Sequence, residues 1–98
     1  MSNISKTDAL ILYYKAILNI LKPRIKDYLS SNQDDIDAKE KAREFLSVTP
    51  EKLIILFSVT DRQTIVSKVN SSMEKYPIPN AEKIMINNLL NKMCDLYV

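Results

Sequence analysis

The feature that most constrains this chain is the absence of glycine from all 98 residues. Average usage of about 7% would give roughly seven glycines. Glycine is the usual residue in turns that need a positive φ angle, in β-bulges and wherever backbone approaches a phosphate closely. A chain without it has few means of making tight hairpins, so we expect helices joined by Asn, Asp, Ser and Pro turns. The predicted fold is all-α, a compact antiparallel bundle of four to five helices in a single domain over residues 1–98.

The composition is that of an ordinary globular protein without a strong charge bias. Apolar residues make up 46% of the chain and charged residues 27%. The 14 basic and 12 acidic residues give a net charge of +2, which is too balanced to indicate nucleic-acid or membrane binding by itself. Lys15 and Asn19 interrupt the most apolar stretch, residues 9–21, so we expect no membrane span. The lone Cys94 cannot form an internal disulfide, which favours a reducing compartment and a cytoplasmic protein.

Helical periodicity predicts a long first helix over about residues 6–30. Ser5 is its expected N-cap, and Asp8 follows three positions later as in a capping box. Pro23 lies inside this helix and lacks a backbone N–H, so we expect a kink or a break near it. The predicted inward stripe consists of Leu10, Tyr14, Ile17, Leu21, Ile25 and Tyr28.

A second helix is predicted to end near Leu46, with Ser31 or Asn32 as its N-cap. Its expected core face is thin and consists of Ala38, Ala42, Phe45 and Leu46. Three carboxylates cluster near its start, namely Asp34, Asp35 and Asp37. The positive end of the helix dipole explains this cluster without a binding site.

A third helix is predicted to begin at Pro50 after a Thr49 N-cap. Residues 53–57 are apolar without a polar break, which is typical of a helix that is buried on all sides. A buried strand is the competing interpretation of so short a run, but the capping residues favour a helix. We therefore expect this helix, residues 50–58, to lie near the centre of the bundle.

Two further helices are predicted after residue 60. Thr60 and Gln63 form a capping box for a helix that continues to about Lys75. Residues 76–79 should be extended, because each of their two prolines moves its predecessor out of the α region. Asn80 is the expected cap of the last helix. The predicted inner faces of the two helices are Ile65, Val66, Val69, Met73 and Tyr76, and Ile86, Leu89, Leu90, Met93 and Tyr97.

The sequence argues against most kinds of catalysis. There is no histidine, so Ser-His-Asp and Cys-His arrangements are impossible within the chain, and zinc loses its usual ligands. Phosphate-binding loops and EF-hand calcium loops need glycine. We expect a protein that is not an enzyme and that holds no cofactor or metal.

Residues 53–68 resemble the two helices of a helix-turn-helix motif. In that family the second helix reads the major groove, and here it would start at Asp61. The resemblance implies that Arg62, Gln63 and Lys68 contact DNA. Two core helices joined by a capped turn would account for the same residues.

Surplus apolar sequence favours a protein-binding module instead. Residues 9–14 and 53–57 are both apolar on all sides of a helix, and a chain this small can enclose only about one helix completely. Some of this surface should face a protein partner or a second copy in a homodimer. The candidate anchors for such a contact are Tyr13, Tyr14, Tyr76 and Tyr97. Each of them could equally be a half-buried core residue with its hydroxyl in water.

The proline-containing link at residues 74–80, EKYPIPN, precedes an amphipathic helix. This arrangement resembles that of small immunity proteins that protect bacteria against their own peptide bacteriocins. The resemblance implies a cytosolic antiparallel helix bundle that acts on a protein partner, a profile shared by phage and viral inhibitors of host enzymes. The leading hypothesis is a non-enzymatic protein-binding function as an inhibitor, immunity factor, adaptor or regulator. DNA binding is the alternative.

Overall fold

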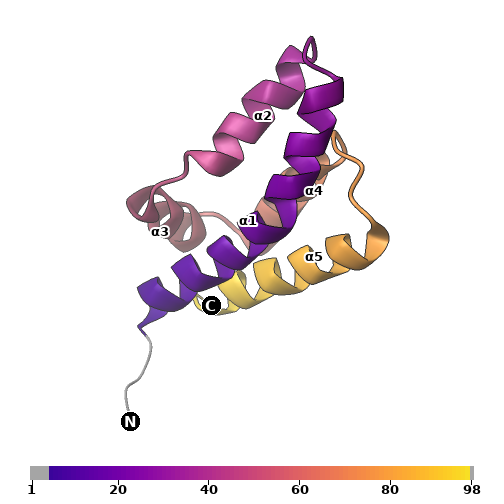
Figure 1. Ribbon diagram of the computed structural model, residues 1–98. Helices are drawn as coiled ribbons and strands as arrows, with labels where there is room; N and C mark the ends of the chain where they lie inside the picture. Colours follow the sequence, from indigo (N-terminus) through magenta and orange to yellow (C-terminus); the bar gives the residue numbers. More distant parts are fainter. Residues whose placement is uncertain (1–4, 98) are drawn as a thin grey trace.

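The computed structural model describes residues 5–97, which form five α-helices (Figure 1). The helices are α1 (Lys6–Ser31), α2 (Ile36–Leu46), α3 (Pro50–Val59), α4 (Arg62–Met73) and α5 (Asn80–Asp95). No strand is present within the described range. The prediction of an all-α bundle is confirmed.

Helices α1 and α5 form the framework of the molecule, and they make its most extensive helix contact (Figure 1). They run antiparallel, because Arg24 near one end of the contact meets Glu82, and Lys6 near the other end lies 5.9 Å from the ring centre of Tyr97. The guanidinium of Arg24 binds the Glu82 carboxylate through two hydrogen bonds of 2.9 and 2.7 Å. Two parallel bonds of this kind fix direction as well as distance.

The core lies where α1 and α5 face each other and receives side chains from every other helix. The largest fully buried side chains are Leu10, Ile17, Leu21, Met73, Ile86 and Met93. These residues belong to the apolar stripes that the sequence predicted for α1, α4 and α5. Periodicity at three and four residues was therefore sufficient to place the main core residues.

Helix α1 continues without interruption through Pro23, so the expected break is wrong. Pro23 and Asn19 are both exposed, and the Asn19 carbonyl that loses its helical partner can bond to water instead. A kink at Pro23 stays a prediction. Within the described residues, no helix combines the length and the hydrophobicity needed to cross a lipid bilayer.

The start of α2 differs from the prediction. Ser31 is the last residue of α1, and Asn32 is its C-cap. Asp35 is the N-cap of α2, because its carboxylate accepts hydrogen bonds from the Ala38 N–H at 3.0 Å and from the Tyr28 hydroxyl at 2.6 Å. The tertiary bond from Tyr28 selects Asp35 over the other polar residues of this loop.

Helix α3 begins where the sequence predicted but is not buried on all sides. Leu53 and Phe57 are buried, whereas Ile55 and Val59 are 61% and 76% exposed. The helix packs on α1 along one face and lies at the edge of the molecule (Figure 1). The expectation of a central helix is wrong, because α1 and α5 already fill the centre.

The caps of the last two helices also shift by one residue. Asp61 caps α4 in place of Thr60, because its carboxylate accepts from both the backbone N–H and the hydroxyl of Thr64, at 3.0 and 2.7 Å. Pro79 occupies the cap position of α5, so Asn80 is its first helical residue. The link between the two helices was predicted to be extended, but the Ile78 N–H donates to the Tyr76 carbonyl at 2.8 Å, which makes a tight turn at Pro77, and Ile78 is buried.

Candidate functional site

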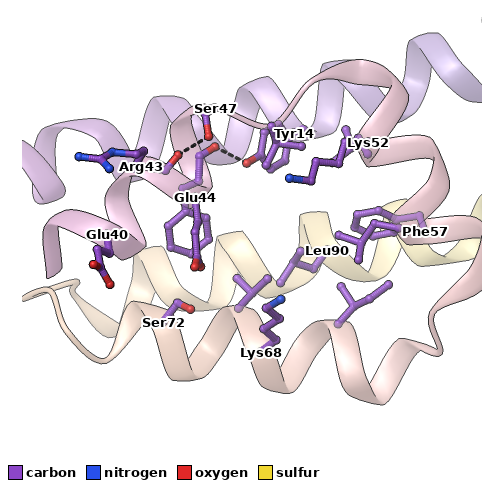
Figure 2. A pocket seen from close by; sticks show the side chains of 16 residues that line it. Tyr14, Glu40, Arg43, Glu44, Ser47, Lys52, Phe57, Lys68, Ser72 and Leu90 are labelled. Atoms are coloured by element: carbon purple, nitrogen blue, oxygen red, sulfur yellow. Dashed lines mark hydrogen bonds between the residues drawn. The ribbon is translucent and has the colours of Figure 1, made fainter. Parts of the chain in front are cut away.

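A groove opens between α2 and α4, two helices that hardly touch. Helix α2 packs on α1 and helix α4 packs on α5, which leaves a hollow of about 570 Å³ between them. Helix α3 lies at one end, and side chains of α1 and α5 form part of the floor (Figure 2). The apolar floor of this groove consists of Tyr14, Phe45, Val48, Leu53, Leu56, Phe57, Ile65, Val69 and Leu90. Its polar rim consists of Glu40, Arg43, Glu44, Ser47, Lys52 and Lys68, and the buried Ser72 lines the groove as well.

Tyr14 connects the floor of the groove to its α2 wall. The Tyr14 hydroxyl donates a hydrogen bond to the carbonyl of Phe45, one of the last carbonyls of α2 and therefore without a helical partner (Figure 2). Burial raises the pKa of Tyr14 to about 12. The phenol is thus a protonated donor at neutral pH, with its aromatic face available to the groove.

The opposite end of α2 is held by a second tyrosine. The Tyr76 hydroxyl donates to the carbonyl of Ala38 at 2.6 Å, and Lys75 forms an ion pair with Asp37 at 3.2 Å. Because Lys75 and Tyr76 follow α4 directly, these contacts close the groove at the start of α2. Helix α2 is therefore fixed at both ends, and the hollow between α2 and α4 stays open.

The charged side chains of the rim form no ion pair with any residue that the structure describes. Two glutamates, Glu40 and Glu44, lie on the α2 wall together with Arg43, while Lys52 and Lys68 come from α3 and α4. The side chains of Glu44, Lys52 and Lys68 point toward the hollow (Figure 2). Among the described residues, the ion pairs are Arg24–Glu82, Arg62–Asp95 and Lys75–Asp37, none of which includes a rim residue.

Apolar surface continues from the groove onto the outside of α3. Leu56 lines the groove and is 37% exposed, and its neighbours Ile55 and Val59 are more exposed still. Scattered exposed apolar residues are normal on proteins, whereas these three lie close together on one helix beside the groove. We refer to Ile55, Leu56 and Val59 as the α3 strip.

The predicted tyrosine anchors do not form one surface. Tyr14 lies in the groove, whereas Tyr13 and Tyr97 are half-buried at the α1–α5 contact, beneath the ammonium groups of Lys92 and Lys6. Such cation–π contacts hold the rings against the protein itself. Of the four predicted anchors, Tyr14 alone lines the groove.

Tyr76 requires a correction, because it is 3% exposed and offers almost no surface to a partner. Its ring meets that of Tyr28 edge-on at 5.6 Å, which is a favourable aromatic arrangement. Burial, reinforced by nearby acidic side chains, raises the pKa of Tyr76 to about 12. The apolar periodicity had already placed Tyr76 on the inner face of the fourth helix, and the structure confirms that position over the anchor role.

The three residues implied by the helix-turn-helix resemblance are spread around α4. Successive helical residues are about 100° apart, which places Arg62, Gln63 and Lys68 on three different sides of the helix. The Arg62 guanidinium pairs with Asp95 and donates to the Asn91 side chain at 3.1 Å, so it is tied to α5. Lys68 lies at the groove rim.

The lone cysteine, Cys94, is buried. Burial raises the pKa of the Cys94 thiol, which disfavours the reactive thiolate. Cys94 lies away from the groove, beside a smaller pocket of about 200 Å³ that Arg62 and Tyr97 also line. The described part of the chain contains no cluster of three or more histidine, cysteine, aspartate or glutamate side chains suited to a metal ion.

Comparisons of the chain with protein-family models, curated protein sequences and solved structures gave no match.

Sequence reasoning missed most of the groove rim. Glu40, Glu44 and Lys52 were not among the predicted site residues, although the two glutamates are four positions apart and therefore share one side of a helix. That spacing is equally typical of a solvated helix face. The distinguishing feature is the apolar hollow beside them, whose floor is assembled from five helices.

Proposed function

We propose that this protein acts without catalysis, by binding another protein in the groove between α2 and α4. The roles that fit are those of an inhibitor, immunity factor, adaptor or regulator. The observation that carries the proposal is the combination of an apolar floor, a charged rim that forms no ion pair with the described residues, and the adjoining α3 strip. This is the organisation of a protein interface, with an apolar centre and a polar periphery.

The chemistry of the available side chains supports a binding role. The Tyr14 hydroxyl is engaged with the Phe45 carbonyl, and the Cys94 thiol is buried outside the groove. The groove thus offers shape, apolar area and charge to a ligand. The lone buried cysteine suits a reducing compartment, so we place the function in the cytoplasm. A homodimer remains part of the proposal as one way of covering the α3 strip.

Affinity capture with two matched variants tests the proposal. Leu56→Glu places a charge at the groove edge, whereas Ile84→Glu places the same charge at an exposed apolar residue of α5 outside the groove. Both positions are exposed, so both variants should keep the helical fold, which circular dichroism can verify. Lysate from the source organism should be treated with nuclease before capture, so that a nucleic-acid bridge is removed.

The proposal predicts a protein that is retained by the wild type and by Ile84→Glu but lost from Leu56→Glu. Retention that is equal on all three proteins would contradict it. Retention that disappears with nuclease and with Arg62→Ala plus Lys68→Ala would instead support the DNA-binding alternative, because binding dominated by phosphate contacts requires basic side chains.

A further inference from the structure

We infer that the occupant of the groove is a short amphipathic helix of another protein, about two turns long, with one basic and one acidic flank. The inference rests on the protein-binding function proposed above and names the chemistry of the partner. Two properties of the groove support this inference, namely its length and the charges of its two walls. A third observation is that no described helix of a second copy would match the groove.

The length of the groove fits two helical turns. On α4 its lining residues run from Ile65 to Ser72, seven positions apart. A rise of 1.5 Å per residue makes this span about 10.5 Å. Helices that bind in grooves use apolar anchors at positions i, i+3 or i+4, and i+7, which cover the same distance. The apolar floor below accepts the anchors, and Leu56 extends it at the α3 end.

The two walls differ in charge, which defines the flanks of the partner helix. The α2 wall presents Glu40 and Glu44 with Arg43 between them in sequence, and the other side presents Lys52 and Lys68. A helix lying between these walls would be complemented by basic residues toward α2 and acidic residues toward α3 and α4. Opposite charges across an interface determine partner choice and register more than total affinity.

A second copy of this chain does not offer such a helix. The large apolar residues exposed within the described range are Leu12, Ile36, Leu46, Ile55, Leu56, Val59, Ile84 and Met85. No helix among those described presents three of them at the i, i+3 or i+4, i+7 spacing. The α3 strip supplies an i, i+4 pair and then ends at Val59. The observations therefore favour a helix from a different protein.

The test uses two libraries of stapled helical peptides about 14 residues long, because unstapled peptides of this length are marginally helical. Both libraries vary the three anchors among Leu, Ile, Phe and Met. One carries a basic and an acidic flank, and the other carries acidic residues on both flanks. Affinity is measured by fluorescence anisotropy at low ionic strength, against the full chain and against a variant with Glu40→Lys and Glu44→Lys.

A second double variant, Asp27→Lys with Glu74→Lys, controls for net charge. It makes the same change in charge as the groove variant, at exposed residues that do not line the groove. All four positions are exposed, so we expect each protein to keep its fold. Leu56→Glu and Ile84→Glu serve again as the apolar variant and its control.

The wild type should bind the best mixed-flank peptide about fivefold more tightly than the best acidic peptide, since each exposed charge pair contributes modestly. The groove variant should reverse this preference, and the net-charge control should keep it. Leu56→Glu should lower the affinity for the mixed-flank peptide at least about tenfold, whereas Ile84→Glu should leave this affinity unchanged.

Failure of every peptide to bind, or a preference that does not reverse, would overturn the inference. So would a wild-type dimer that Leu56→Glu dissociates in light scattering, because a second copy would then cover the groove edge. These failures differ from failure of the proposed function, since a captured protein that depends on Leu56 would still support binding at the groove.

Discussion

At the scale of single residues, two tyrosine hydroxyls determine where α2 lies. Tyr14 donates to the Phe45 carbonyl near one end of the helix, and Tyr76 donates to the Ala38 carbonyl near the other. Between them, the small buried Ala42 lets α2 approach α1 closely. The Tyr14 contact holds the end of α2 on α1, and the Tyr76 contact ties the start of α2 to the link that follows α4, so the groove opens between these two points.

The same two phenols should make the protein less stable in alkaline solution. Burial raises both pKa values to about 12 in the folded state, compared with about 10 for tyrosine in an unfolded chain. The unfolded chain therefore loses protons first, so their contribution to stability is complete below about pH 10 and declines toward pH 12. Urea titrations at about pH 9 and pH 11 measure how much unfolding free energy is lost between these two pH values. The loss should be smaller for Tyr14→Phe plus Tyr76→Phe than for the wild type. Equal losses in the two proteins would contradict the raised pKa values of Tyr14 and Tyr76.

The α2 cap gives a second test at residue scale. Asp35→Ala should lower the free energy of unfolding, because it removes the N-cap of α2 and the partner of the Tyr28 hydroxyl. The neighbouring Asp34→Ala is the control, since Asp34 is exposed and outside the helix. Urea titrations that show the same loss for both variants would contradict the cap assignment.

Acid should weaken the contribution of Asp35 specifically. The hydrogen bond from Tyr28, followed by the one from the Ala38 N–H, lowers the pKa of the Asp35 carboxyl. A carboxyl with a lowered pKa in the folded state stabilises the fold above its unfolded pKa of about 3.9, and this stability is lost as the pH falls. The difference in stability between Asp35→Ala and the wild type should therefore shrink in acid. A difference that stays constant as the pH falls would contradict a lowered pKa of Asp35.

At the scale of elements, α4 is attached to α5 by a polar pair. The side-chain amides of Asn70 and Asn87 bond to each other reciprocally, at 2.7 and 3.1 Å, and both residues are half-buried. Arg62 adds contacts to Asn91 and Asp95 further along the same helix. The Asn70–Asn87 pair fixes the register of α4, the helix that carries Lys68, against α5.

A double-mutant cycle can measure this pair. Asn70→Ala leaves the Asn87 amide without its reciprocal partner and should cost about 1–3 kcal/mol of unfolding free energy. Replacing both residues by alanine should cost less than the sum of the two single variants, because no amide is then left half-satisfied. Strict additivity in urea titrations would show that the two amides do not interact.

Sequence reasoning succeeded for elements whose stability is local. The stripe of Leu10, Ile17 and Leu21 predicted the buried side of α1, and the Thr49–Pro50 pair placed the start of α3. It failed where several cap-forming residues stand together. Thr60 and Asp61 both suit an N-cap, and the double bond between Asp61 and Thr64 selects the second.

The groove could not be predicted, because its walls are set by tertiary packing. Nothing in the α2 sequence indicates that it packs on α1 and leaves α4 uncovered. The apolar run of α3 suggested a central position, since periodicity cannot distinguish a helix enclosed by its own fold from one that keeps apolar residues for a partner. Exposed apolar residues do occur on α3, in the α3 strip, and a partner that covers them stays a prediction.

At the scale of the whole molecule, the framework and the groove have separate roles. The α1–α5 contact carries the core and the Arg24–Glu82 pair, far along the sequence from the groove rim. The rim charges make no ion pairs among the described residues, so they contribute little to the stability of the fold in that way. Changes on the rim should therefore alter binding more than folding.

Site-specific photocrosslinking in cells that produce the protein tests the central claim most directly. A benzophenone amino acid replaces Leu56 at the groove edge or, as the control, the exposed Ile84 of α5. Irradiation is expected to attach a partner protein to the chain from position 56 and not from position 84. Attachment of the same partner from both positions, or from position 84 alone, would contradict the claim that the groove is the binding surface.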